Sequence, residues 1–501
     1  MTKSSTPSFV VEYPIIVNSK SHQELSARFN AGFRLYNTIQ SEALIRMELV
    51  RKSSAWAEAK KMSKTIINKK GEKISNPERV KAFQAAKQAY GFTDYQLQTY
   101  AKLVAHRSVW MRLKLDSQCI QKLATRAFEA VDKILFGKAR KVRFKNNHSF
   151  RSMEGKQITT GIRVERNSQM FVWGKLQCPI MVNWLDPCEK HGWDSSWKYA
   201  RIIRRELNGK RRWFVQIICK GIPYHGRANT QFKDDKGSID LNISNIAYVG
   251  TAAAGLKPFA NKVPTFEKEI KAIQRQQDRS RRINNPDNYN PNDIVFKGKK
   301  KGRPVVRQGQ IKRGKKLEWN CSKNYQRLGK TRRELERRKT AYTKSQNRAL
   351  ANEVLRETGI HQNLENVSVK GWQKRYGKAI SSKSPGFFQS ELIRKAEGAG
   401  GSVNRYSTQK TATSQTHLDG ERVKKKLSER VHRDRTGIVM QRDLFSAFLG
   451  LFVNQEGNLS VEEARNSYPR LEPVLKAAWA EYHQRSSAKA NTFSQIILSD
   501  L

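Results

Sequence analysis

Three acidic residues stand in apolar or element-edge surroundings in a chain dominated by positive charge. Asp240 lies in GSIDLNISNIAYVG (237–250), Glu365 lies in NLENVSV, and Asp443 directly precedes the apolar run LFSAFLGLFV. Mg²⁺ prefers carboxylate oxygens. Two such ions, roughly 3.5–4 Å apart, can clamp the attacking and leaving oxygens of phosphodiester hydrolysis. The three acids are therefore candidate catalytic residues and ligands for two Mg²⁺ ions.

The residues around each acid predict which secondary-structure element carries it. The alternation in IDLNI predicts a strand in which Asp240 points away from the face of Ile239 and Leu241. Glu365 is expected at the end of a short strand and Asp443 at the start of an apolar helix. For Glu365 taken alone we favour an ion pair with an arginine. Only the fold can bring the three together, because they lie far apart in the sequence.

Asp434 is a rival to Asp443 for the third position. We prefer Asp443, because the run that follows it predicts a rigid apolar helix. Asp434 lies among loop-forming and basic residues.

The charge of the chain points to a polyanionic partner. The 501 residues include 96 Lys and Arg against 44 Asp and Glu, which gives a formal net charge of +52. Such a charge repels itself in a compact state unless a polyanion neutralises it. Nucleic acid is the expected partner, since each neutralised phosphate releases counterions. The length predicts two to four domains.

The N-terminal half is expected to combine a β-rich module with a helical insertion. Ser21 and Glu24 form a capping-box pattern at the start of a long amphipathic helix, and more helix is expected to about residue 135. From 136 to about 230 the pattern predicts strands. Asn208-Gly209 predicts a two-residue type I′ hairpin turn.

The C-terminal half begins with the strand that carries Asp240. Two basic helices follow, the second of which is expected to end at Gly359. Between them, KGKKKGRPVVRQGQIKRGKK predicts a mobile basic loop.

Two basic regions are candidate nucleic-acid contacts. The first interleaves basic and aromatic residues between Phe136 and Phe150, a pattern suited to phosphate binding and base stacking. The second consists of arginines on the two basic helices, and few acids accompany them. The candidate contact residues are Lys138, Arg140, Arg143, Phe144, Arg275, Arg279, Arg282, Arg332, Arg333 and Arg337.

The five cysteines include no CxxC pair, so neither a four-cysteine zinc site nor a disulfide framework is expected. The first residues lack the apolar stretch of a signal peptide. The longest apolar run is too short to span a bilayer, so no membrane partner is expected.

Several of these stretches together resemble one family. GSIDLNISNIAYVG, NLENVSVKGW and MQRDLFSAF look like the first, second and third motifs of RuvC-type nuclease domains. With FRLYNTIQSEALIRM, IQKLATRAFEAVDKILFGK and SPGFFQSELIRKAEGAGGSV, the chain resembles TnpB, a family of transposon-encoded RNA-guided nucleases related to type V CRISPR effectors. The resemblance covers about residues 8 to 455.

The resemblance implies a multidomain fold of α+β and α/β classes. It implies a β-barrel-like wedge domain with a helical recognition insert, followed by an RNase H-like RuvC nuclease domain that carries a small insert. The expected boundaries are 1–20 and 136–232 for the wedge, 21–135 for the recognition domain, 233–400 for the RuvC domain, 401–440 for a degenerate zinc-ribbon-like insert, and 441–501 for the RuvC C-terminal part and tail.

The implied activity is RNA-guided cleavage of double-stranded DNA beside a short target-adjacent motif, with Asp240, Glu365 and Asp443 as the Mg²⁺-binding residues. The implied partners are a guide RNA, from a transposon end or a CRISPR array, and target DNA. The implied location is the bacterial cytoplasm, at the nucleoid when DNA is bound. Whether the protein is a monomer or a dimer stays open. A nuclease-inactive RNA-guided repressor and a general nucleic-acid-binding protein are alternatives.

The insert departs from the family pattern. His417, Asp419, Asp434 and Thr436 stand where the resemblance would place cysteines. Threonine is a poor zinc ligand and basic residues are abundant nearby, so zinc is not expected there.

Overall fold

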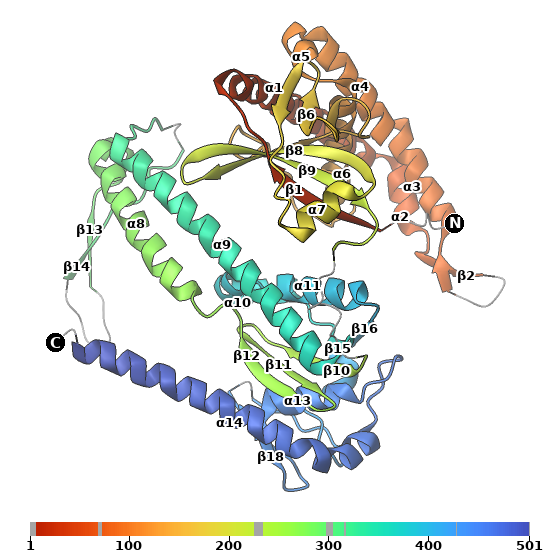
Figure 1. Ribbon diagram of the computed structural model, residues 1–501, viewed down its shortest axis with the longest axis vertical. Coiled ribbons are helices and arrows are strands. Elements are labelled where there is room, and N and C mark those ends of the chain that lie inside the picture. Colours follow the sequence, from red (N-terminus) through yellow and green to blue (C-terminus); the bar gives the residue numbers. More distant parts are fainter. Residues whose placement is uncertain are drawn as a thin grey trace. The chain divides into compact units, whose positions relative to one another are not determined.

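The computed structural model describes residues 7–68, 73–224, 234–296, 304–314, 317–426 and 428–499. The chain divides into two compact units, Met1–Tyr224 and His225–Leu501 (Figure 1). Each unit combines helices with a β-sheet, so the protein is a mixed α+β protein of more than one domain.

The first unit is built on a four-stranded antiparallel sheet. Its strand order is β1 (Ser8–Pro14), β9 (Lys210–Lys220), β8 (Trp197–Leu207) and β4 (Ser152–Glu154). The first strand therefore pairs with a strand about 200 residues later, as an insertion within a β-rich module requires. A second sheet contains β5 (Ile162–Glu165), β6 (Met170–Trp173) and β7 (Leu176–Pro179).

The predicted hairpin at Asn208-Gly209 is confirmed. Leu207 pairs with Lys210, which leaves a two-residue turn. Both turn residues have positive φ, 50° for Asn208 and 72° for Gly209, as a type I′ turn requires.

The long helix α1 (Ser19–Lys52) begins earlier than the sequence predicted. Asn18, rather than Ser21, is its N-cap, and the Asn18 side chain accepts a hydrogen bond from the Ser21 backbone N–H. Asparagine is as favourable as serine at an N-cap position, so residue type alone does not decide between Asn18 and Ser21. The predicted apolar stripe is buried at Leu25, Phe29 and Tyr36.

The rest of the first unit is largely helical up to residue 135. Its other elements are α2 (Ser54–Lys61), β2 (Thr65–Ile67), β3 (Lys73–Ser75), α3 (Pro77–Ala89), α4 (Asp94–Arg107), α5 (Val109–Lys114), α6 (Ser117–Leu135) and α7 (Pro187–Asp194). One apolar core joins α1 to the sheet, where the Phe29 ring lies edge-on to those of Phe150 and Trp213.

The second unit is built on a five-stranded sheet with mixed directions. Its order is β12 (Ala254–Pro258), β11 (Asn245–Gly250), β10 (Lys236–Leu241), β15 (His361–Glu365) and β16 (Val403–Tyr406). The pairs β12–β11 and β11–β10 are antiparallel, whereas β10–β15 and β15–β16 are parallel. Strand β10 therefore lies at the centre of the sheet. Residues 403–406, which the expected boundaries give to the insert, form its edge strand.

Helices cover both faces of this sheet (Figure 1). Ile239 and Leu364 belong to a core cluster with α9 (Lys323–Thr358) and α11 (Pro385–Gly398). Ala247 and Val249 belong to another cluster with α13 (Arg442–Leu451) and α14 (Val461–Ser499). Helix α13 is buried at every residue, which explains its almost continuous apolar sequence.

The remaining elements of the second unit are α8 (Val263–Asn284), a short 3₁₀ helix (Pro286–Asn288), β13 (Asp293–Phe296), β14 (Pro304–Arg307), α10 (Val369–Lys383), α12 (Thr408–Thr411), β17 (Val431–Arg433) and β18 (Val439–Gln441). Helices α8 and α9 pack side by side (Figure 1). Gly359 ends α9 with a φ of 90°, as predicted. The basic stretch from 297 to 316 contributes strand β14, where a loop was expected, and residues 297–303 and 315–316 lie outside the described residues.

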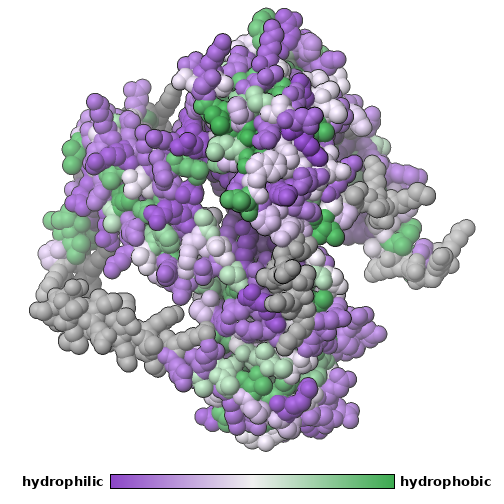
Figure 2. All heavy atoms as spheres, in the orientation of Figure 1, coloured by the Kyte–Doolittle hydropathy of each residue, from purple (hydrophilic) through white to green (hydrophobic). Residues whose placement is uncertain are grey.

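Hydrophilic residues cover most of the face shown in Figure 2. Among the described residues, every helix is too short or too polar to cross a membrane.

Candidate active site

Asp240 and Glu365 lie side by side near the carboxyl ends of β10 and β15, two neighbouring strands of the five-stranded sheet. Strands β10 and β15 are parallel neighbours, with Ile239 opposite Leu364, so Asp240 and Glu365 each follow by one residue. Because Ile239 and Leu364 face the α9 and α11 side, alternation turns the two acids toward the α13 side. The predicted orientation of Asp240 is confirmed by Ala247, its partner on β11, which packs in the α13 cluster.

Helix α13 brings Asp443 close to these two acids. This helix packs across β10 and β11, and Asp443 lies in its first turn. Gln441 caps the helix by accepting a hydrogen bond from the Leu444 N–H at 2.7 Å, and its amide nitrogen donates to Asp443 Oδ2 at 3.1 Å. The side chain of Asp443 is thereby fixed by the residue that starts the helix.

A glycine lets α13 approach the sheet. A Cβ atom at Gly450 would overlap the Ser238 hydroxyl on β10 and would lie 2.6 Å from the Tyr406 hydroxyl on β16. Any larger residue at position 450 would therefore push α13, and with it Asp443, away from the sheet.

The electrostatics of the acids reflect burial and mutual repulsion. Burial, followed by the charges of Glu365 and Asp443, raises the pKa of Asp240 well above its ordinary value. Burial also raises the pKa of Glu365, and a hydrogen bond from Thr413 partly offsets this rise. Burial and the charges of Glu365 and Asp240 raise the pKa of the nearby Tyr406 phenol. A cation among the acids would relieve this repulsion.

Two hydroxyls beside the acids were missed by the sequence reasoning. Thr413 Oγ1 donates to Glu365 Oε1 at 2.8 Å and lies 2.8 Å from Ser446 Oγ on α13. The Ser446 hydroxyl also hydrogen-bonds to Asp240, so the two hydroxyls together contact both acids. Ser446 follows Asp443 by less than one helical turn, and that spacing is the only signal the sequence offered.

The acid site fits a hard divalent cation by its chemistry. Its donors are carboxylate oxygens, which Mg²⁺ prefers. Two arginines lie near them: Arg430 Nη1 is 4.0 Å from Asp443 Oδ2, and the charge of Arg442 acts on Asp240. Within the described part of the chain, however, the one set of three mutually close ligating side chains is His417, His432 and Asp434 in the insert. The three acids are neighbours, but their oxygens do not converge to that degree.

Asp434, the rival to Asp443, belongs to that insert group and not to the acid site. It is buried and bonded to His432, Leu418 and Thr436. The charges that raise the pKa of Asp240 come from Glu365 and Asp443.

The basic candidates differ in their exposure and in their partners. Lys138, Arg140, Arg143 and Phe144 are exposed, as are Arg275, Arg279 and Arg333. Arg282 pairs with Asp278 at 2.8 Å, Arg337 pairs with Glu334 at 2.8 Å, and Arg332 donates to Gln277 at 2.9 Å. Arg332 also lies 3.6 Å from Glu336, so the expectation that acids are too few to pair with these arginines is wrong for Arg282, Arg332 and Arg337. Phe150 is fully buried in the first unit, so it is core and not a stacking residue.

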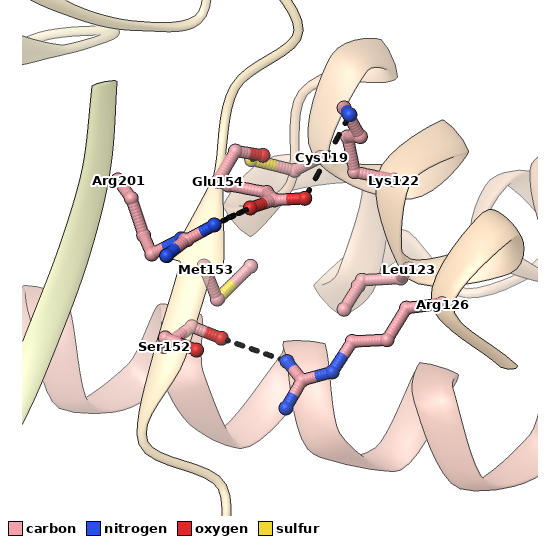
Figure 3. A pocket seen from close by; sticks show the side chains of 8 residues that line it. All are labelled: Cys119, Lys122, Leu123, Arg126, Ser152, Met153, Glu154 and Arg201. Atoms are coloured by element: carbon pink, nitrogen blue, oxygen red, sulfur yellow. Dashed lines mark hydrogen bonds and ion pairs between the residues drawn. The ribbon is translucent and has the colours of Figure 1, made fainter. Parts of the chain in front are cut away.

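A cavity of about 300 Å³ in the first unit gathers three further cations (Figure 3). Glu154 accepts two hydrogen bonds from Arg201, at 2.9 and 2.6 Å, and lies 3.7 Å from the Lys122 ammonium. Arg126 donates to the Ser152 carbonyl at 3.2 Å. These contacts join α6 to β4 and β8, and they account for the cations as a structural junction.

Comparison with known proteins gives similar structures but no family. No protein-family model matches the chain, and no curated protein matches it. It is similar to a Cas12f1–sgRNA–target DNA complex, with 11% identity, a TM-score of 0.42, and coverage of 91% of this chain and 100% of that one. It is also similar to a CRISPR-Cas12f ternary complex, with 13% identity, a TM-score of 0.28, and coverage of 85% and 81%. Both TM-scores are below 0.5, so function has to be argued from the residues of the site.

Proposed function

We propose that this protein is an RNA-guided, Mg²⁺-dependent DNA endonuclease of the TnpB type. Its second unit would be the nuclease domain, of RNase H-like fold, and its first unit the wedge and recognition domains. The observation that carries the proposal is the meeting of Asp240 and Glu365, on adjacent parallel strands, with Asp443 on the helix that covers them. The guided activity rests on the family resemblance and on the charge of +52.

In this proposal each residue of the site has a definite task. Asp240, Glu365 and Asp443 would hold the metal, and Mg²⁺ when bound supplies Lewis-acid stabilisation of phosphoryl oxygens and an activated water. Thr413 orients Glu365 through its hydrogen bond, and Gln441 orients Asp443. The central strand and the fully buried helix hold these groups rigidly.

The test is cleavage of matched DNA by the complex of the protein with its own RNA. The RNA that copurifies is sequenced, and double-stranded DNA matching its variable end is supplied with Mg²⁺. We expect Asp240→Asn to reduce the cleavage rate at least about 100-fold, because several kcal/mol of transition-state stabilisation are lost, while DNA binding is kept. Asp293→Asn, an exposed acid on β13, is the matched control.

Each other outcome has a definite meaning. Equal cleavage by Asp240→Asn would show that the site is assigned wrongly. A wild-type complex that protects its target without cutting it would establish the repressor alternative. A heterogeneous mixture of copurified RNA, with no defined end, would favour a general nucleic-acid-binding protein.

A further inference from the structure

A buried polar group lies at the centre of the insert. His417, His432 and Asp434 are each at most 6% exposed, and one nitrogen or oxygen atom from each lies within 4.8 Å of the others. The family resemblance would place zinc in this insert, so the first question is whether these residues fit a zinc ion.

The Asp434 carboxylate is already fully hydrogen-bonded. Its Oδ1 accepts from the Thr436 N–H at 3.0 Å and from the Thr436 hydroxyl at 2.7 Å. Its Oδ2 accepts from the Leu418 N–H at 3.1 Å and lies 3.0 Å from His432 Nε2. A carboxylate accepts about four hydrogen bonds, so this one has no lone pair left for a metal. These bonds lower its pKa, against the effect of burial.

Three of the four imidazole nitrogens are hydrogen-bonded as well. The Lys425 ammonium contacts His432 Nδ1, and since an ammonium can only donate, it uses the Nδ1 lone pair. The proton of His432 is then on Nε2, from which it is donated to Asp434. His417 Nδ1 accepts from the Arg435 N–H at 3.1 Å. The nitrogens that face Asp434 therefore have no lone pair for zinc, which requires one from each ligand. His417 Nε2 is buried without a partner in the described part of the chain, and it carries that ring's proton.

We propose that hydrogen bonds do in this insert what a metal would otherwise do, and that they position Asp443. The unit, which we call the Asp434 clasp, consists of Asp434 with His432, Thr436 and the Leu418 N–H. It joins the 417–418 segment to the β17–β18 hairpin without any metal ion.

The Asp434 clasp is in direct contact with the helix that carries Asp443. The His432 ring stacks on Phe445 of α13, with centroids 3.8 Å apart and an angle of 17° between the rings. Strand β18 continues into Gln441, which caps α13 and donates to Asp443. On the other side of the clasp, the Leu418 carbonyl accepts two hydrogen bonds from Arg465 of α14, at 2.8 and 2.6 Å. Loosening the clasp would therefore release the start of α13.

The absence of a structural metal is tested without any activity assay. The full-length protein is purified without chelator, and its zinc, iron and other transition metals are measured by mass spectrometry. We expect less than stoichiometric metal, and the same melting temperature before and after treatment with a zinc chelator. One tightly bound transition-metal ion per chain, or a lower melting temperature after chelation, would overturn the metal-free clasp.

The positioning role is tested with Asp434→Asn. Its amide has one oxygen, so it cannot accept both from Thr436, as Oδ1 does, and from His432 and the Leu418 N–H, as Oδ2 does. Asp419→Asn is the matched control, because Asp419 is in the same insert but pairs at the surface with Arg435, at 3.2 Å. Hydrogen exchange of the amides at the start of α13 should become faster in Asp434→Asn and stay unchanged in Asp419→Asn. Unchanged exchange in both variants would overturn the positioning role.

The link to catalysis rests on the proposed function and has its own readout. We expect Asp434→Asn to slow cleavage by up to about 100-fold, as small displacements of catalytic groups do, and to raise the Mg²⁺ concentration that gives half-maximal cleavage. If Asp434→Asn fails to fold, Thr436→Val removes a single hydroxyl bond and should shift the Mg²⁺ dependence in the same direction. A lower amount of active protein with an unchanged Mg²⁺ dependence would reduce the clasp to a purely structural element. If the wild type cuts nothing, the proposed function fails, while the metal and exchange measurements still decide on the clasp.

Discussion

Thr413 donates its hydroxyl hydrogen to Glu365 across 2.8 Å, although 48 positions separate the two residues in the sequence. The same hydroxyl lies 2.8 Å from the Ser446 hydroxyl on the helix that carries Asp443. One threonine thus joins the strand side of the acid site to its helix side. Thr413 is buried, so if its hydroxyl were removed, bulk water could not readily supply the missing hydrogen bond to Glu365.

Thr413→Val should lower the cleavage rate about tenfold while the protein stays folded. The substitution leaves a buried carboxylate oxygen without its donor, which costs about 1–3 kcal/mol. Thr340→Val is the control, because that hydroxyl donates to a helix carbonyl on an exposed surface. Rates are compared under single-turnover conditions, and equal rates for the two variants would show that Thr413 has no role at the site.

Gly450→Ala should destabilise the protein by about 1–3 kcal/mol and slow cleavage, because the new methyl group overlaps Ser238 and crowds Tyr406. Gly398→Ala in α11 meets no atom within 4 Å and should change stability by no more than about 0.5 kcal/mol. Denaturant unfolding measures both variants. Equal stabilities would contradict the close approach of α13 to the sheet.

The metal-free protein should lose stability as the pH rises above the acidic range. The pKa values of Asp240 and Glu365 are raised above their ordinary values of 3.8 and 4.5. The folded state therefore binds more protons than the unfolded state. Their contribution to stability is greatest below the ordinary values and is lost as the pH rises through the raised ones.

This linkage is measured by unfolding in EDTA across a pH series. Asp240→Asn should be more stable than the wild type at neutral pH, because it removes the charge that burial and Glu365 oppose. Added Mg²⁺ should stabilise the wild type more than the variant. Wild-type stability that rises with pH in EDTA would refute the assigned direction.

Arg275 and Arg279 should contribute more to nucleic-acid binding than Arg337. Both are exposed and make no ion pair within the described part of the chain, whereas Arg337 is held by Glu334. Replacing both with Gln should reduce the slope of log affinity against log salt by about 2. The control Arg337→Gln should reduce it less. Slopes are obtained from binding to guide RNA at several salt concentrations, and a larger effect of Arg337→Gln would reverse the assignment.

Much of the local structure could be predicted from short-range patterns. The Asn208-Gly209 turn, the end of α9 at Gly359 and the face of β10 on which Asp240 lies all follow from residue type and spacing. The N-cap of α1 was predicted three residues late, at Ser21 in place of Asn18, because both residue types are good caps and residue type alone does not distinguish them. Strand β14 was missed because only two β-branched residues, Val305 and Val306, stand within a run of basic residues.

The sequence by itself determined which residues could perform chemistry: three acids in apolar settings within a chain of charge +52. Only the tertiary structure decided which residues lie next to these acids. It placed Asp240 beside Glu365 through parallel strand pairing, put Asp443, which the sequence already favoured over Asp434, next to them, and brought Thr413 and Ser446 between them. It also paired several arginines that had been expected to be free. The physical reason is that residue type and periodicity fix the face of an element, whereas the contacts between distant faces depend on how the whole core packs.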